Sequence, residues 1–196
     1  MNKIILDKSK FIELNVSEDS ICNISKDYVL NELNVNISDN VKFVINHYSE
    51  IKDNNLNVNI FQNNNSEFIY NHSFLNNGDY NLNININMNG NKSKNVINIH
   101  GISDHGDTYI VVDGLVNEET VNNELDEKIK MLNINNGKSN IMPNMFIDTK
   151  NVVANHAASV KDIDEDYLFY LKSKGIDSEE AKKLILDGFL YNEAKE

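Results

Sequence analysis

The sequence predicts a mainly β protein that ends in a short pair of helices. Apolar residues recur at every second position in several stretches between residue 1 and about residue 160, which is the period of a half-buried strand. Clusters of Asn, Gly, Ser and Asp that favour turns separate these stretches, and no convincing helical segment lies among them. This pattern excludes a doubly wound α/β fold and leaves a sandwich, a barrel or a β-solenoid.

The clearest predicted strand covers residues 80–88. Asparagines fill one of its faces, and the opposite face is formed by Tyr80, Leu82, Ile84, Ile86 and Met88. Shorter strands are predicted at 55–61, 67–74, 95–102 and 108–116. The turn signals between them are NNNS at 63–66, NNGD at 76–79, NGNKSK at 89–94 and SDHGD at 103–107. We expect the many asparagines to fill solvent-facing strand positions and turns.

Two helices are predicted after Asp162. The first has acidic residues at its start, lysines in its last turn and a stop at Gly175, and its helical spacing is set by Tyr167, Leu168, Tyr170 and Leu171. The second begins at Asp177, which has capping-box spacing to Glu180, and ends at Gly188. Its apolar stripe is predicted to consist of Ala181, Leu184 and Ile185.

The charge balance argues against nucleic acid and membrane surfaces as partners. The net charge is −12, and every cationic side chain apart from histidine is a lysine. An acidic surface repels phosphate backbones and anionic lipids, and without arginine the bidentate contact to phosphate or guanine cannot form. With no apolar run long enough to span a bilayer and no signal-peptide run, we expect a cytoplasmic protein. The single cysteine, Cys22, is expected to pack as a small hydrophobe.

Residues 143–190 resemble the C-terminal signature of the SufB/SufD family. The family pattern is roughly P-x-L-x-I, then D-V-x-x-x-H-x-A-T-V-G-x-I-D-x-x-x-L-F-Y-L-x-S-R-G-I, then E-A and a final G-F. A much weaker likeness extends back to about residue 70. The residues that match the pattern are Pro143, Ile147, Val152, His156, Ala158, Val160, Ile163, Asp164, Leu168, Phe169, Tyr170, Leu171, Ser173, Gly175, Ile176, Glu180, Ala181, Gly188 and Phe189.

The resemblance implies a right-handed parallel β-helix flanked by C-terminal helices. It implies a β-helix core domain at 1–160 and a C-terminal helical segment for ATPase docking at 161–196. In this family two subunits pair through their cores, the helices bind the SufC ATPase, and neither core subunit hydrolyses ATP. We therefore expect a non-enzymatic scaffold subunit of SUF iron–sulfur cluster assembly, with a SufC-type ATPase and a SufB-like subunit or a second copy as partners.

Departures from the family pattern favour the SufD side. The long N-terminal region of full-length members is absent, which implies a shortened member. Asn155-His156-Ala157 replaces the Ser-His-Gly of SufD-like members, and Lys161 and Lys174 replace a glycine and an arginine. SufB-like members use a core cysteine that this core lacks, and cluster assembly needs thiolate ligands or sulfur acceptors. We expect no tightly bound cofactor, but a transient iron–sulfur cluster shared with a partner.

His156 is the histidine expected to do chemistry. Imidazole ligates iron, and the resemblance implies that this residue contacts iron or the nascent cluster at the subunit interface. The alternative is a packed residue with one hydrogen bond. His100 and His105 do not fit a closed zinc pattern and predict a polar turn. His47 and His72 show no constellation of partners in the sequence.

The docking contact is expected on the helical hairpin. The residues favoured for it are Tyr167, Tyr170, Leu171, Lys174, Gly175 and Ile176. No P-loop, G-x-S-x-G or G-x-G-x-x-G motif is present, so ATP binding must come from the partner. Two other functions stay open: a β-solenoid enzyme acting on polysaccharide, and a purely structural β-solenoid.

Overall fold

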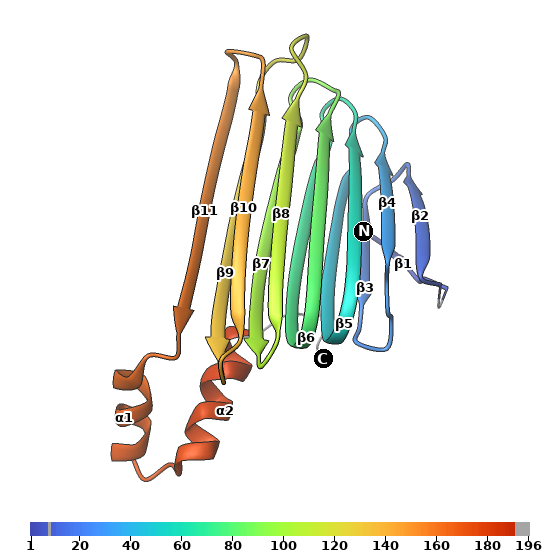
Figure 1. Cartoon of the computed structure of the whole chain (residues 1–196). Coiled ribbons are helices and arrows are strands. Elements are labelled where there is room, and N and C mark those ends of the chain that lie inside the picture. The colour runs from blue at the N-terminus through green and yellow to red at the C-terminus, as the bar shows by residue number, and fades with distance from the viewer. Residues whose placement is uncertain (8, 191–196) are drawn as a thin grey trace.

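The structure is a computed structural model that describes residues 1–7 and 9–190, so the end of the helical segment expected at 161–196 lies outside the described residues. It contains parallel strands in two stacked faces, followed by two helices (Figure 1). The strands are β1 (Asn2–Ile4), β2 (Phe11–Val16), β3 (Ser20–Ile24), β4 (Glu32–Ile37), β5 (Lys42–Gln62), β6 (Glu67–Met88), β7 (Lys94–Asp104), β8 (Asp107–Val116), β9 (Asn123–Ile134), β10 (Lys138–Ile147) and β11 (Val152–Asp162). The helices are α1 (Glu165–Ser173) and α2 (Ser178–Phe189).

The chain winds as a parallel β-solenoid. One face, which we call the first face, follows the order β1-β3-β5-β6-β7-β9-β11, and the second face contains β2, β4, β8 and β10. The long strands β5 and β6 run through both faces, because their first halves pair with β3 and β7 and their second halves with β4 and β8. Every strand pair is parallel. This confirms the predicted β-solenoid with two C-terminal helices and removes the sandwich and the barrel.

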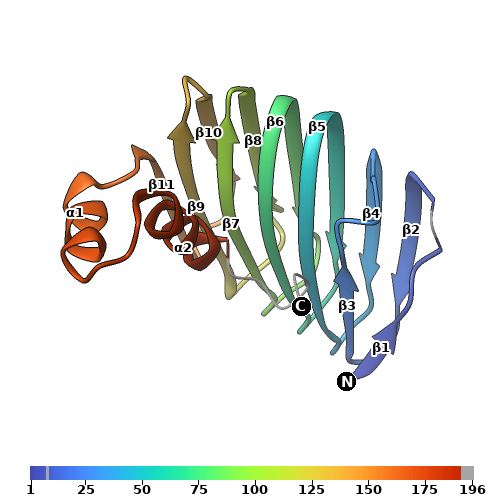
Figure 2. The same cartoon turned by 90° about the horizontal axis from the view of Figure 1, so that it is seen from below.

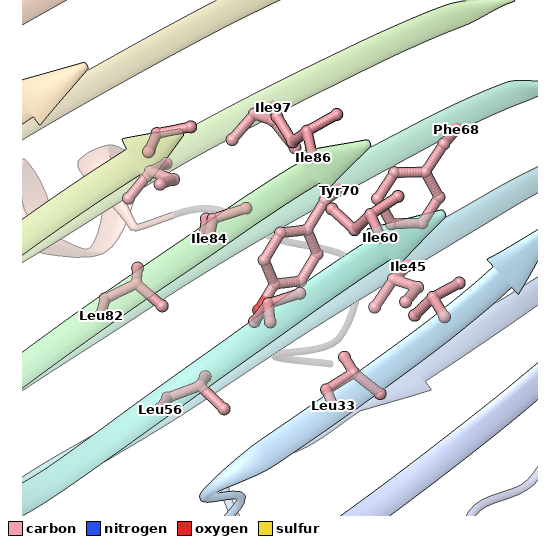
Figure 3. Packing of buried hydrophobic residues seen from close by; sticks show 14 of the residues in the cluster. Leu33, Ile45, Leu56, Ile60, Phe68, Tyr70, Leu82, Ile84, Ile86 and Ile97 are labelled. Atoms are coloured by element: carbon pink, nitrogen blue, oxygen red, sulfur yellow. The ribbon is translucent and has the colours of Figure 1, made fainter. Parts of the chain in front are cut away.

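The hydrophobic core lies between the two faces (Figure 3). Side chains alternate along a strand, so every second residue points inward. In the strand segment predicted at 80–88, all five apolar residues are buried, and stacking in register places Leu82 beside Leu56 and Ile84 beside Val58. Full burial of one such side chain contributes roughly 1.5–3 kcal/mol. Cys22 is buried in the same core, as expected, and burial raises the pKa of its thiol to about 11.

Asparagines stack into hydrogen-bonded ladders on the outside of the solenoid. On the second face, the Asn59 amide donates to Asn34 Oδ1 at 2.8 Å, and the Asn85 amide donates to Asn59 Oδ1 at 2.8 Å. On the first face, Asn98 donates to Asn71 at 2.9 Å in the same way. The expectation that asparagines occupy the outward positions of the strands is therefore confirmed for these ladders, whereas Asn95 and Asn123 are buried.

The prediction of a turn between two strands at NNGD, residues 76–79, is wrong. These residues lie inside β6, which bends from one face to the other (Figure 2). Its pairing with β5 continues through the bend apart from a register irregularity between Ile51 and Asp53, and on its other side the partner changes from β7 at Asn76 to β8 at Tyr80. Gly78 makes the bend possible, because a Cβ there would lie 1.3 Å from the carbonyl oxygen of Lys52. A glycine can therefore serve a continuous bent strand as well as a turn.

The two helices have different relations to the solenoid. The C-terminal end of α2 covers an apolar cluster on the outside of the first face, formed by Tyr48, Ile102, Leu132 and Ile134 together with Leu186, Phe189 and Leu190. In α2 the predicted stripe is only partly right: Ala181 is buried, but Leu184 is 50% exposed. The helix ends at Phe189, one residue beyond the predicted stop at Gly188.

The first helix, α1, projects past the last strand, β11, and none of its residues is buried (Figures 1 and 2). Within the described part of the chain, neither helix has the length and hydrophobicity to span a membrane.

Candidate functional site

Among the described residues, the stack of strands ends at β10 and β11, and we call this end of the solenoid the open end. Strand β10 is the last strand of the second face, and β11 is the last strand of the first face. Among the described residues, no strand of the second face follows β10 to lie across from β11. Val152 and Ala154 still pack against the core, whereas His156 and Ala158, further along the same side, are exposed.

His156 lies on the same side of β11 as Val152 and Ala154, in register with a buried glutamate. In the pairing of β11 with β9, His156 is directly opposite Glu127. Residues opposite each other in a parallel pair point to the same side, and neighbouring strands are about 4.8 Å apart. The structure thus pairs the histidine that the sequence singled out, in strand register, with a buried glutamate that it did not.

Glu127 is fully buried, and neither of its carboxyl oxygens has a hydrogen-bond partner among the described residues. Burial raises the pKa of this carboxyl to about 7, and the nearby charges of Asp113 and Asp126 act in the same direction. A strongly perturbed, unpartnered carboxyl group is a mark of a functional site. The signal in the sequence was a charged residue at an inward position, between Leu125 and Ile129 in the period-2 pattern.

The residues predicted to dock the ATPase gather around α1, but they differ in exposure. Tyr167 and Tyr170 are 65% and 57% exposed, and the Lys174 ammonium lies 5.4 Å from the centre of the Tyr170 ring. Leu171 and Ile176 are only partly exposed. Phe169, which sequence reasoning did not choose for the contact, is the most exposed aromatic residue of the helix, at 75%.

The connection between the helices is fixed by local hydrogen bonds. The Ile176 N–H donates to the Leu171 carbonyl and the Gly175 N–H to the Lys172 carbonyl, which together form a Schellman motif. Gly175 has a φ of +86°, so the predicted glycine stop is confirmed. Asp164 and Asp177 cap the two helix starts by accepting backbone N–H groups, as the acidic starts predicted.

The prediction that His47 and His72 lack a constellation is wrong. Their rings stack at a centroid distance of 4.1 Å inside the solenoid. Tyr70 Oη lies 2.9 Å from His47 Nδ1 and 3.0 Å from His72 Nδ1. Ser49 Oγ lies 2.8 Å from His47 Nε2 and 3.4 Å from His72 Nε2. The four side chains form a closed ring, which we call the histidine ring.

The remaining histidine prediction, a polar turn around His105, is confirmed. His105 has a φ of +63° between β7 and β8, and its Nδ1 lies 2.7 Å from Asp104 Oδ1. His100 instead stacks on Phe189 of α2. Among residues 1–7 and 9–190, no three His, Cys, Asp or Glu side chains are grouped as a metal site.

Comparison with known proteins agrees with this architecture. The family described as SUF system FeS cluster assembly, SufBD core domain, matches residues 8–189 of the chain. The chain belongs to the SufBD core domain family. The match covers β2 to α2, so the SufBD likeness extends through the solenoid well beyond the helical signature. Membership also supports a role in iron–sulfur cluster assembly.

Curated SufBD proteins match shorter stretches. The chain is 36% identical over 84 residues to an iron–sulfur cluster assembly SufBD family protein of Mycobacterium leprae, which is 42% of this chain and 21% of that protein. It is 41% identical over 69 residues to the iron–sulfur cluster assembly protein SufD of Bacillus subtilis, 35% of this chain and 16% of that one. Protein ABCI7, chloroplastic, of Arabidopsis thaliana is 40% identical over 50 residues, 26% of this chain and 10% of that protein. The matched stretches thus span about a fifth or less of the relatives' own length.

Proposed function

We propose that the chain is a non-enzymatic, SufD-like scaffold subunit of iron–sulfur cluster assembly in the cytoplasm. In this proposal α1 and the turn after it bind a SufC-type ATPase, and the solenoid pairs through its open end with a SufB-like subunit or a second copy. His156 contacts iron or a transient cluster there. The SufD name of the Bacillus subtilis relative and the placement of the chain's one thiol, Cys22, away from the open end support the SufD side.

The observation that carries the proposal is the exposed aromatic surface of α1. Tyr167, Phe169 and Tyr170 are all more than half exposed, on a helix with no buried residue. Exposed aromatic side chains mark protein–protein contacts, because aromatic residues dominate binding hot spots. The helix that does pack on the solenoid is α2, so α1 remains available to a partner.

Pairing is supported by the free edges of β10 and β11. A strand at the edge of a sheet presents unpaired N–H and C=O groups that favour another strand. Exposed apolar side chains accompany these edges: Met142 and Phe146 of β10 are 46% and 53% exposed, and Val153 and Val160 of β11 are 60% and 43% exposed. Such edges suit a second subunit whose own last strands continue the sheet.

The test of ATPase docking uses substitutions on α1 in place of truncation. Removing the helices would uncover the apolar cluster under α2 and weaken the solenoid itself. The double variant Tyr167→Ser and Phe169→Ser changes only exposed side chains and should keep the fold. We expect it to lower capture of a SufC-type ATPase at least tenfold in a pull-down, equal to about 1.4 kcal/mol.

The matched control is Phe11→Ser, because Phe11 is 66% exposed but lies on β2, at the opposite end of the stack. Its capture of the ATPase should equal that of the unsubstituted chain, with and without nucleotide. Equal capture by the α1 double variant would refute the docking site.

A further inference from the structure

A cavity lies at the corner where β5 passes from the first face to the second. The first half of β5 pairs with β3 and its second half with β4, and the segment 25–31, which joins β3 to β4, lies against β5 between these two stretches. The Asn54 amide donates to the Leu30 carbonyl at 2.8 Å, and the Asn31 amide donates to Asn54 Oδ1 at 2.8 Å. These bonds hold the segment on β5 beside a cavity of about 240 Å³, which we call the corner cavity.

The buried part of the wall of the corner cavity is mostly apolar. Leu30, Ile51 and Leu56 supply aliphatic surface, and each of them is buried. Two polar residues of the histidine ring, His47 and Ser49, also line the cavity, but they bond to each other at 2.8 Å between Nε2 and Oγ. The polar groups of these two side chains are therefore already engaged within the fold.

Tyr80 lines the corner cavity from β6 with a hydroxyl group that the fold does not use. Its side chain is fully buried, and Oη has no hydrogen-bond partner among the described residues. Burial, together with the neighbouring Tyr70, raises the pKa of Tyr80 well above 10, so the hydroxyl keeps its proton and can donate it to a hydrogen bond. A buried donor without a partner is unfavourable, and a bound molecule with an acceptor atom would satisfy it.

The size of the corner cavity selects the size of its ligand. An apolar cavity of roughly 150 Å³ holds benzene, and pockets for drug-sized molecules begin at roughly 300 Å³. At about 240 Å³ the corner cavity suits a single ring with a small substituent.

The charges around the corner cavity favour a neutral ligand. Burial lowers the pKa of His47 to about 3, so its imidazole is neutral. The charged residues that line the cavity, Glu50, Lys52 and Asp53, are exposed and therefore belong to its mouth. A charged group that entered the cavity would leave water without meeting an opposite charge on the buried part of the described wall, and such a transfer is costly.

We propose that the corner cavity binds one neutral single-ring molecule that carries a carbonyl or a similar hydrogen-bond acceptor, and that Tyr80 Oη donates to this acceptor. The binding is non-covalent, and no proton or electron is transferred. The site lies on β5 and β6, away from both α1 and the open end at β10 and β11. It therefore adds a ligand site to the proposed role in cluster assembly and does not depend on that role.

The experiment titrates the full chain with acetophenone and with two matched probes. Ethylbenzene has the same ring without the acceptor, and benzoate has a charged group in place of the neutral one. We expect acetophenone to bind at one site per chain and to shift the methyl NMR signals of Leu30, Ile51 and Leu56, because a bound aromatic ring changes the resonances of nearby methyl groups. Ethylbenzene should bind about three- to tenfold more weakly, and benzoate should not bind.

Tyr80→Phe removes the donor and keeps the ring. We expect it to weaken acetophenone binding about three- to tenfold and to leave ethylbenzene binding unchanged. Its melting temperature should not fall, because the hydroxyl has no partner in the described part of the fold. The matched control is Tyr109→Phe, at a residue of β8 that is 46% exposed and lies outside the corner cavity. This control should bind every probe as the unsubstituted chain does.

Several outcomes would overturn the proposal. If no probe gives saturable binding, the corner cavity holds water only. If acetophenone and ethylbenzene bind equally well, or if Tyr80→Phe binds acetophenone as the unsubstituted chain does, Tyr80 does not recognise the acceptor. Shifts confined to exposed side chains such as Leu115 and Met142 would show binding at the surface instead.

The α1 double variant Tyr167→Ser and Phe169→Ser should bind acetophenone as the unsubstituted chain does. In the same way, Tyr80→Phe should capture the SufC-type ATPase fully. Failure of the ligand site and failure of the docking site are therefore read out independently.

Discussion

At the scale of residues, the histidine ring restricts its protons to two arrangements, which run around the circuit in opposite directions. Each neutral imidazole offers one donor and one acceptor nitrogen, and each hydroxyl can donate once and accept. Tyr70 bridges the two Nδ1 atoms and Ser49 bridges the two Nε2 atoms. A closed circuit with one proton in each hydrogen bond therefore needs opposite tautomers in His47 and His72. A protonated imidazole has two donors and breaks the circuit.

The histidine ring should make the fold sensitive to acid. Burial lowers the pKa of His47 from 6.5 to about 3, and burial together with the His47 charge lowers the pKa of His72 well below its usual value. Below pH 6.5 these two histidines bind protons in the unfolded chain but stay neutral in the folded chain. The free energy of unfolding should therefore fall as pH drops from about 6.5 toward 3, by about 1.4 kcal/mol per pH unit for each histidine.

Urea unfolding between pH 7.5 and pH 4.5 measures this dependence. His47→Gln or His72→Gln removes one titrating ring and should flatten the slope by the contribution of one histidine. Identical slopes for the unsubstituted chain and both variants would contradict the assignment, because the carboxyl groups they share would then account for the whole effect.

Residue-scale features were predictable from sequence only where they depend on near neighbours. The packing of Cys22, the glycine stop at Gly175 and the turn at His105 are local and were predicted. Glu127 and the histidine ring depend on which residues lie opposite each other in successive turns. The offset varies along the chain, since Lys42 pairs with Glu67 but Lys94 pairs with Glu124, so no fixed repeat could reveal them.

At the scale of elements, the corners of the solenoid depend on close backbone contact between turns. A Cβ on Gly106, between β7 and β8, would lie 2.0 Å from the carbonyl oxygen of Gly78 in the turn below. Both atoms at this contact belong to backbones, so no side-chain rotation can relieve it. The bend of β6 at Gly78 and the corner at Gly106 thus depend on the same backbone contact between successive turns.

Gly106→Ala should destabilise the protein by about 2 kcal/mol or more, because the corner must move away from the turn beneath it. Gly188→Ala is the matched control: it sits inside α2, and a Cβ added there would meet no other atom within 4 Å. That change should be neutral or stabilise by up to about 1 kcal/mol through helix propensity. Chemical unfolding measures the free energy of unfolding of both variants. Equal stability of the two would disprove the corner contact.

Strands and helices were predictable from the sequence because their apolar residues recur with a regular period. The bend at 76–79 was not predictable in this way. Asn, Gly and Asp in a row indicate a turn in any sequence-based reading, and the same residues suit a strand that turns a corner while it keeps its hydrogen bonds. The difference lies in the neighbouring turn: Asp53 Oδ1 accepts the Asp79 N–H at 2.9 Å and supports the bent strand from β5. That support is not visible in the segment itself.

At the scale of the whole molecule, alternation of apolar and polar residues could not decide between sandwich, barrel and solenoid. All three architectures bury one side of each strand, so the local pattern is the same. Strand direction differs between them, and it is set by pairings between distant residues. The family resemblance supplied the solenoid, and the parallel pairing of all strands confirms it.

The open end predicts the assembly state. Val153→Lys combined with Val160→Lys puts charge on the exposed side chains of β11 and should prevent pairing, either of two copies or with a SufB-like chain. Light scattering after size exclusion measures the mass against the 22.4 kDa of one chain. Ile5→Lys, at a residue 83% exposed near the other end of the stack, is the control and should leave pairing intact. A paired mass retained by the β11 variant would exclude this edge.

Stacking in register also has a consequence for how such proteins change length over evolutionary time. Each turn touches only the turn before it and the turn after it. Asn59 of β5 bonds to Asn34 on one side and to Asn85 on the other, so loss of the whole β5 turn would bring two asparagines together that can bond in the same way. Duplication or deletion of a complete turn therefore leaves the histidine-bearing last strand and the α1 helix unaltered, while the distance between the two ends of the stack grows or shrinks by one strand spacing.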